Sequence, residues 1–138
     1  MIGINLDQFY MGRDQRYFNE LTDELRRNAA ETVRRTNDLL YLFYIHNPTA
    51  KMRSVNSGWR PAAINGGIPG AATRSNHMVC KAVDLSDDDG ALDAWLMSDR
   101  GQKALTEIGL WLEHPSATRG WCHVQISPPH SGNRVFNP

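Results

Sequence analysis

Two histidines and one aspartate have a spacing that suits a catalytic metal ion. His77 and Asp84 lie in the segment SNHMVCKAVD, and His123 lies far downstream in the segment GWCH. Three protein ligands leave the fourth tetrahedral position of a zinc ion open to water, whereas structural zinc sites usually close all four positions with several thiolates. Two neutral imidazoles and one carboxylate leave the centre net positive, so that it can acidify bound water and polarise a carbonyl. We therefore expect His77, Asp84 and His123 to bind Zn²⁺.

A closed site of two cysteines and two histidines is the competing interpretation of the same segments. Cys80 lies three residues after His77, and Cys122 directly precedes His123. If Cys122 and His123 lie on one strand, their side chains point to opposite faces and can hardly bind one ion. Two cysteines also make no disulfide framework. We therefore expect both thiols to be reduced residues of the core.

The sheet that must carry these ligands is predicted from short stretches with a strand pattern. These stretches are Met52–Asn56, Lys81–Leu85, Leu110–His114 and Trp121–Ile126. The last two form a predicted hairpin, because a turn-forming segment separates them. Asp84 and His123 would then come from strands, and His77 from the loop that enters the first of these strands.

Helical patterns account for much of the remaining chain. The predicted helices are Thr22–Phe43 with Thr22 as N-cap, Ala91–Met97, and a helix from Ser98 or Asp99 to Glu107 that ends at Gly109. A short helical turn is expected with Pro61 at its first position. Residues 1–18 are a short lead-in of mixed polarity, Gly66–Arg74 is a loop by composition, and the C-terminal tail is predicted to be irregular. The run of three aspartates at 87–89 lacks the alternation and closing glutamate of a calcium loop, so helix capping explains it better.

The composition is that of an ordinary folded protein and excludes strongly charged binding classes. With 138 residues the chain has about the length of one domain, and we expect a single domain over residues 1–138. Its 15 basic and 15 acidic side chains balance, so no net field attracts nucleic acid or an anionic membrane. The first residues lack a signal-peptide pattern, and no stretch reaches membrane-spanning length. We expect a monomer, made in the cytoplasm, with neither a nucleic-acid nor a membrane partner.

Three motifs resemble those of the D-alanyl-D-alanine zinc metallopeptidase family, which includes peptidoglycan carboxypeptidases and many bacteriophage endolysins. Ser75–Asp84 resembles the family signature SxHxxGxAxD. The segment SGWRP at 57–61 is similar to the upstream SGYR motif, and WCHVQ at 121–125 is similar to the final ligand strand. The motifs come in the expected order and together span most of the chain. The segments MGRD at 11–14 and SGNRVF at 131–136 are further similar to a compact phage-associated subgroup.

The resemblance implies an α+β Hedgehog/D-Ala-D-Ala-peptidase-like fold, with a small antiparallel sheet, helices packed on one side and zinc at the open face. It implies the same zinc ligands, His77, Asp84 and His123. Arg60 would bind and polarise the scissile carbonyl or hold a substrate carboxylate, because its guanidinium offers a planar fork of donors. Ser75 would contact the peptide. Trp121 is either part of the core or a wall of the peptide cleft.

Two positions depart from the family pattern. Cys80 stands where the signature has glycine, and Gly120 stands where the family usually has an acidic catalytic base. We expect Glu113 to replace that base, because the predicted hairpin places it across from the strand that carries His123. Its apolar neighbours would raise its pKa toward a useful range. His114 is the reserve candidate, although strand alternation directs it to the opposite face.

The function expected from these residues is zinc-dependent hydrolysis of stem peptides in bacterial cell-wall peptidoglycan, like an endolysin or a D-Ala-D-Ala carboxypeptidase. Glu113 would take a proton from the attacking water and return it to the leaving amine, while Arg60 helps to hold the oxyanion. The enzyme would act at the cell wall and could be phage-encoded. A noncatalytic zinc module, for wall binding or virion structure, is the alternative, because Gly120 removes the usual base.

Overall fold

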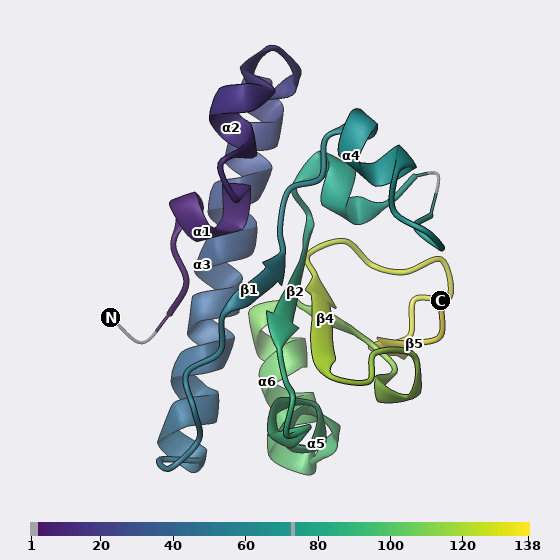
Figure 1. Cartoon of the computed structure of the whole chain (residues 1–138). Coiled ribbons are helices and arrows are strands. Elements are labelled where there is room, and N and C mark those ends of the chain that lie inside the picture. Colours follow the sequence, from purple (N-terminus) through teal and green to yellow (C-terminus); the bar gives the residue numbers. More distant parts are fainter. Residues whose placement is uncertain (1–2, 73) are drawn as a thin grey trace.

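The computed structural model describes residues 3–72 and 74–138 (Figure 1). Met1, Ile2 and Thr73 lie outside the described residues, so the predictions for the N-terminal segment and for the loop Gly66–Arg74 apply there only in part. The helices are α1 (Leu6–Tyr10), α2 (Arg13–Arg16), α3 (Asp23–His46), α4 (Ala62–Gly66), α5 (Ala91–Met97) and α6 (Asp99–Ile108), with 3₁₀ turns η1 (Phe18–Glu20), η2 (Asn76–Val79) and η3 (Pro115–Ala117). The strands are β1 (Val55–Ser57), β2 (Ala82–Ser86), β3 (Trp111–Glu113), β4 (Trp121–Gln125) and β5 (Val135–Phe136).

The strands form one open sheet in the order β1-β2-β4-β3-β5, which confirms the α+β class. The pairs β1·β2, β2·β4 and β3·β4 are antiparallel, and the predicted hairpin of β3 and β4 is confirmed. The expectation of a wholly antiparallel sheet is wrong, because β5 pairs parallel to β3. The irregular tail predicted after β4 therefore contains a short strand, which extends the sheet at its far edge.

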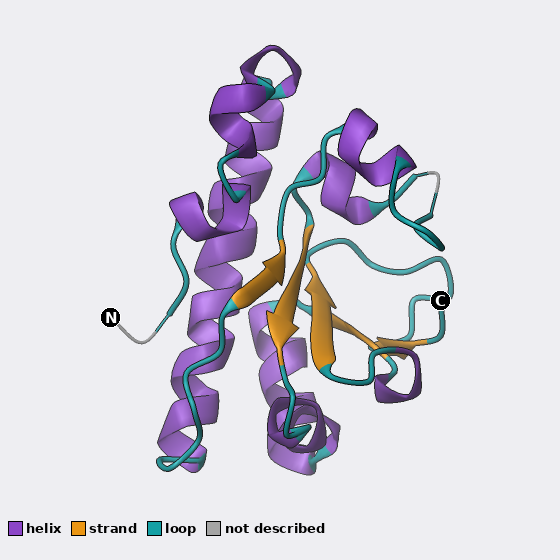
Figure 2. Ribbon diagram, viewed as in Figure 1, coloured by secondary structure: helices purple, strands orange, loops and turns teal. Residues whose placement is uncertain are grey.

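Strand alternation separates a packed face of the sheet from a face that carries polar side chains. Val83 and Leu85 of β2 are fully buried together with Cys122 and Val124 of β4, on the packed face. Figure 2, in the same view as Figure 1, shows α6 behind β2 and the long helix α3 alongside β1, and buried residues of both helices pack in the core with these strands. Asp84 alternates with Val83 and Leu85, so it projects to the other side. The predicted arrangement, with the main helices on one side, is confirmed, while α4 and η2 lie at the end of the sheet (Figure 1).

Capping residues set the ends of the main helices as the sequence predicts. The hydroxyl of Thr22 accepts a hydrogen bond from the amide of Leu25 at 3.2 Å, and α3 then runs to His46. Ser98 caps α6 and Gly109 ends it in the left-handed conformation. The Asp87 carboxylate accepts from the amides of Leu92 and Asp93, each at 2.9 Å, at the start of α5. The capping interpretation of the aspartate run is therefore confirmed.

The N-terminal segment contains helices that the sequence pattern does not predict. The lead-in of mixed polarity forms α1 and α2, and Asn5 begins α1 with a capping box to Gln8. Phe9 of α1 is fully buried, so tertiary packing stabilises a helix too short to be recognised from periodicity. Pro61 is the N-cap of α4 rather than its first residue. Among the described residues, no helix is long and apolar enough to cross a membrane.

Cys80 occupies a strained backbone position immediately before β2. Its φ of 61° lies in the left-handed region, and its side chain is fully buried. Any residue other than glycine is sterically disfavoured in this conformation, because its Cβ comes close to the carbonyl oxygen that follows it. The left-handed backbone conformation is therefore a physical reason why a glycine would suit this position.

Replacement of Cys80 by glycine or by alanine tests this strain. Both changes remove the buried sulfur, but only Cys80→Gly relieves the left-handed conformation. We expect Cys80→Gly to be more stable than Cys80→Ala by about 1 kcal/mol in urea unfolding. An alanine variant as stable as the glycine variant would show that the position is not strained.

Candidate metal centre

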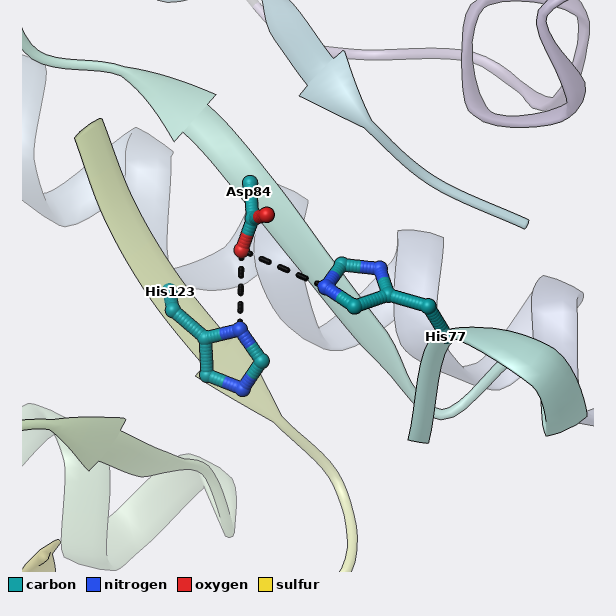
Figure 3. Close-up of side chains that lie close together, drawn as sticks. All are labelled: His77, Asp84 and His123. Atoms are coloured by element: carbon teal, nitrogen blue, oxygen red, sulfur yellow. Dashed lines mark hydrogen bonds and ion pairs between the residues drawn. The ribbon is translucent and has the colours of Figure 1, made fainter. Parts of the chain in front are cut away.

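The three predicted ligands come together at the polar face of the sheet (Figure 3). Asp84 of β2 and His123 of β4 face each other directly in the antiparallel register. His77 approaches from η2, the turn that precedes β2. One ligand atom from each residue can be chosen so that all three atoms lie within 4.8 Å of one another. Residues separated in the sequence thus converge on one point, as the spacing predicts.

A single carboxylate oxygen lies between the two imidazole rings. Oδ1 of Asp84 is 2.8 Å from Nδ1 of His123 and 3.3 Å from Nε2 of His77. The two rings are close, with centroids 5.3 Å apart and planes inclined at 70°. His77 is 2% exposed, so the contact on its side is shielded from water. Any positive charge that binds here meets two ring nitrogens and one oxygen.

The proton of His77 is on the side of the ring that faces away from this point. Nδ1 of His77 lies 2.9 Å from the carbonyl oxygen of Gly58, which only accepts hydrogen bonds, so Nδ1 carries the hydrogen. The other nitrogen, Nε2, then presents a lone pair toward the Asp84 oxygen and is buried with no hydrogen-bond partner among residues 3–72 and 74–138. Two electron-rich atoms face each other at 3.3 Å, which favours a cation between them.

The carbonyl that holds His77 is fixed by the N-terminal helix. Gly58 packs so closely against Phe9 that a Cβ at this position would overlap the Phe9 carbonyl oxygen. The amide of the next residue, Trp59, donates to that same oxygen at 3.0 Å. The helix that the sequence analysis missed therefore contributes to the orientation of a candidate ligand. The signal that could have located the contact is the glycine itself, which permits a close backbone approach.

The electrostatics of the group favour an ionised carboxylate and bound positive charge. Burial by itself would raise the pKa of Asp84, but its contacts with the His123 and His77 rings hold it well below its ordinary value. Burial lowers the pKa of His77, and Asp84 offsets this only in part, so the ring is neutral near pH 7. Burial would also lower the pKa of His123, but its interactions with Asp84 raise it. The carboxylate thus retains its charge in a partly buried position.

The donor set fits a catalytic zinc ion better than a closed structural site. Two imidazoles and one carboxylate leave a coordination position free, as in catalytic zinc centres. Cys122 is fully buried on the packed face, opposite to His123, and Cys80 is also fully buried in the hydrophobic core. Both thiols are free. The closed alternative with two cysteines is therefore not supported, and the prediction of reduced core cysteines is confirmed.

A cleft with a volume of about 420 Å³ opens over the three residues. Every further residue predicted for the site lines it, namely Arg60, Ser75, Glu113 and Trp121. Trp59, the neighbour of Arg60, is only 1% exposed and belongs to the core. The walls also contain residues that the sequence did not predict for the site, among them the loop 68–72, Phe136 of β5 and Gln125 of β4. Phe136 lies edge-on to the His123 ring, with centroids 6.2 Å apart.

Among the described residues, Arg60 has no carboxylate partner at hydrogen-bonding distance. Its guanidinium Nη2 lies 3.5 Å from the hydroxyl of Ser75, and its buried Nε has no hydrogen-bond partner in the part of the chain that the structure describes. Burial lowers its pKa from the ordinary value, while the nearby charge of Asp84 has the opposite effect. The backbone amide of Arg60 donates to the carbonyl of His77, which ties it to the metal-ligand segment. Its guanidinium is thus available to an anionic or carbonyl group in the cleft.

Glu113 shares the cleft with the three candidate ligands. It is the last residue of β3, which pairs with β4 through Leu112 opposite Val124. Burial raises the pKa of Glu113, Asp84 raises it further, and His123 has the opposite effect. This direction agrees with the upward shift expected from partial burial. The neighbouring His114 directs its ring to the hydroxyl of Ser116, and it does not line the cleft.

Comparison of the chain with protein-family models, with curated proteins and with solved structures gave no match. The resemblance to the zinc metallopeptidases therefore remains a prediction. A function for this chain has to be inferred from the chemistry of the site.

Zinc binding can be measured as a stabilisation of the folded state. A ligand that binds only the folded state stabilises it by about 2.7 kcal/mol when its free concentration is 100-fold above Kd. We expect Zn²⁺ to raise the midpoint of thermal unfolding and a chelator to reverse the change. His123→Ala should remove the response, and the exposed His130→Ala should retain it. An equal response in the two variants would place the metal elsewhere.

Proposed function

We propose that this protein is a zinc-dependent peptidase. The proposal rests on the buried Nε2 of His77, whose lone pair faces Oδ1 of Asp84. Nδ1 of His123 lies beside the same oxygen and supplies the third candidate ligand atom. Arg60 and Glu113 line the same cleft, so a positive donor and a carboxylate with raised pKa lie beside the candidate metal. This combination suits hydrolysis of a carbonyl compound.

In the proposed reaction, each of three cleft residues has a separate role. A bound zinc ion would supply Lewis acidity and a more acidic water. Glu113 takes the proton of the attacking water and returns it to the leaving amine, because its raised pKa keeps both steps accessible. Arg60 donates to the carbonyl oxygen as negative charge develops there. Ser75 contacts the Arg60 guanidinium and so supports its position.

Gly120 explains why a glutamate on another strand would serve as the base. Gly120 has a φ of 92°, a conformation that acidic side chains rarely adopt, and an added Cβ would meet open space. Its carbonyl accepts a hydrogen bond from the amide of Asp87, which holds the turn. An acid at this position would therefore strain the turn. Glu113 supplies a carboxylate from the neighbouring strand instead.

The proposed substrates are stem peptides of bacterial peptidoglycan. The walls of the cleft combine apolar side chains, including Ile68, Trp121 and Phe136, with donors that suit a peptide backbone or a carboxylate. The balanced charge of the chain fits a substrate other than nucleic acid. The resemblance of three motifs to enzymes of wall peptides supports the same class. The site of action would then be the bacterial cell wall.

Replacement of Glu113 by glutamine tests its role as the base. We expect Glu113→Gln to lower the rate of peptide release from purified peptidoglycan by about 10²–10⁴-fold, because the amide cannot take the proton. Zinc binding should persist, since Glu113 is not among the proposed ligands. The matched control is Glu107→Gln on α6, where the glutamate is exposed and pairs only with Lys103.

The outcomes of this assay separate the peptidase from its alternative. Unchanged turnover in Glu113→Gln would remove Glu113 from the role. A wild-type protein that binds zinc and peptidoglycan but releases no fragment would support the noncatalytic zinc module. Chelator should abolish turnover if the activity depends on the metal.

Replacement of Arg60 by lysine tests the oxyanion contact. Lysine keeps the charge but loses the planar fork, so we expect kcat to fall by about 10²-fold, the usual cost of one lost donor. The exposed Arg100→Lys on α6 is the control. A change confined to KM would show that Arg60 binds the ground state and the transition state equally.

A further inference from the structure

The outer side of the His123 ring is held by a glutamine. Nε2 of His123 lies 2.9 Å from Oε1 of Gln125. Both residues are on β4, two positions apart, so their side chains share the polar face of the sheet. Gln125 is 3% exposed, which shields this hydrogen bond from competing water.

A second hydrogen bond fixes which end of the Gln125 amide faces the ring. Nε2 of Gln125 donates to the carbonyl oxygen of Ser127 at 2.9 Å. That carbonyl accepts only, so the nitrogen of the amide must point to it and the oxygen must point to His123. Oε1 also accepts only, and its partner on the ring must be an N–H. The hydrogen of a neutral His123 is therefore on Nε2, and Nδ1 presents its lone pair to Asp84.

The same residues connect the two segments that carry the histidines. The hydroxyl of Ser127 donates to Oδ1 of Asn76 at 2.9 Å, and Asn76 directly precedes His77. The carbonyl of Asn76 accepts from the amide of Lys81, next to β2. Gln125 pairs with Ala82 across the sheet. The amide of Gln125 thus lies in a continuous set of contacts between β4, β2 and η2.

We infer that Gln125 is a positioning residue of the metal centre, which fixes Nδ1 of His123 as the ligand atom. The inference rests on the proposed zinc site. Gln125 does for His123 what the Gly58 carbonyl does for His77: it binds the outer N–H, so that the inner nitrogen faces Asp84. Such outer hydrogen bonds orient a ligand ring and increase its basicity, and their loss typically weakens metal binding about 10–100-fold.

Replacement of Gln125 by methionine tests the inference, because methionine keeps the length of the side chain and removes the acceptor. We expect the dissociation constant for Zn²⁺, measured by competition with a chromophoric chelator, to rise about 10–100-fold. The matched control is Gln102→Met on α6, whose amide donates to the carbonyl of Leu96 far from the site. Equal zinc affinity in the two variants and the wild type would overturn the inference.

The protonation of the ring can be read directly in the zinc-loaded wild type, so the test does not depend on how a variant folds. We expect ¹⁵N NMR of histidine-labelled protein to show His123 with its hydrogen on Nε2 and zinc on Nδ1. Zinc bound at Nε2 would overturn the role of Gln125 while leaving the metal site intact. Absence of zinc binding in the wild type would overturn the proposed function itself, and the inference with it.

Discussion

The site depends on one carboxylate oxygen held between two imidazole nitrogens. Asp84 lies in a largely buried position, where its pKa is held well below the ordinary value, so it keeps its charge. The neutral His77 ring cannot donate a hydrogen bond to Asp84, because its single N–H is on Nδ1 and is bound to the Gly58 carbonyl. A cation completes this arrangement at low cost, whereas an empty centre leaves two lone pairs opposed in a poorly hydrated space.

The fold places each part of this contact by a separate physical rule. Antiparallel register sets Asp84 opposite His123, and strand alternation directs both away from the hydrophobic core. The core behind them is formed by fully buried residues such as Val83 and Val124, which hold the two strands against the helices. Close backbone packing at Gly58 brings the N-terminal helix against the loop that orients His77. The geometry of the ligands therefore depends on packing far from the metal.

The sequence predicts the ligands and the main elements because their signals are local or periodic. Thr22 and Ser98 are caps with a hydroxyl beside an apolar repeat, and the hairpin that places Glu113 follows from strand patterns around a turn. The helix around Phe9 and the strand around Phe136 escaped prediction, because each is too short to show a period and is stabilised by contacts distant in the sequence. No local pattern in the sequence marks such contacts. They nevertheless shape the site, because Phe136 forms part of the cleft wall and Phe9 packs against Gly58, whose carbonyl orients His77.

The most direct test is anomalous X-ray scattering at the zinc absorption edge, from crystals of protein purified with zinc. We predict one peak, at bonding distance from Nε2 of His77, Nδ1 of His123 and a carboxylate oxygen of Asp84. Zinc bound elsewhere, or an ordered site with the same side-chain positions and no anomalous peak, would contradict it.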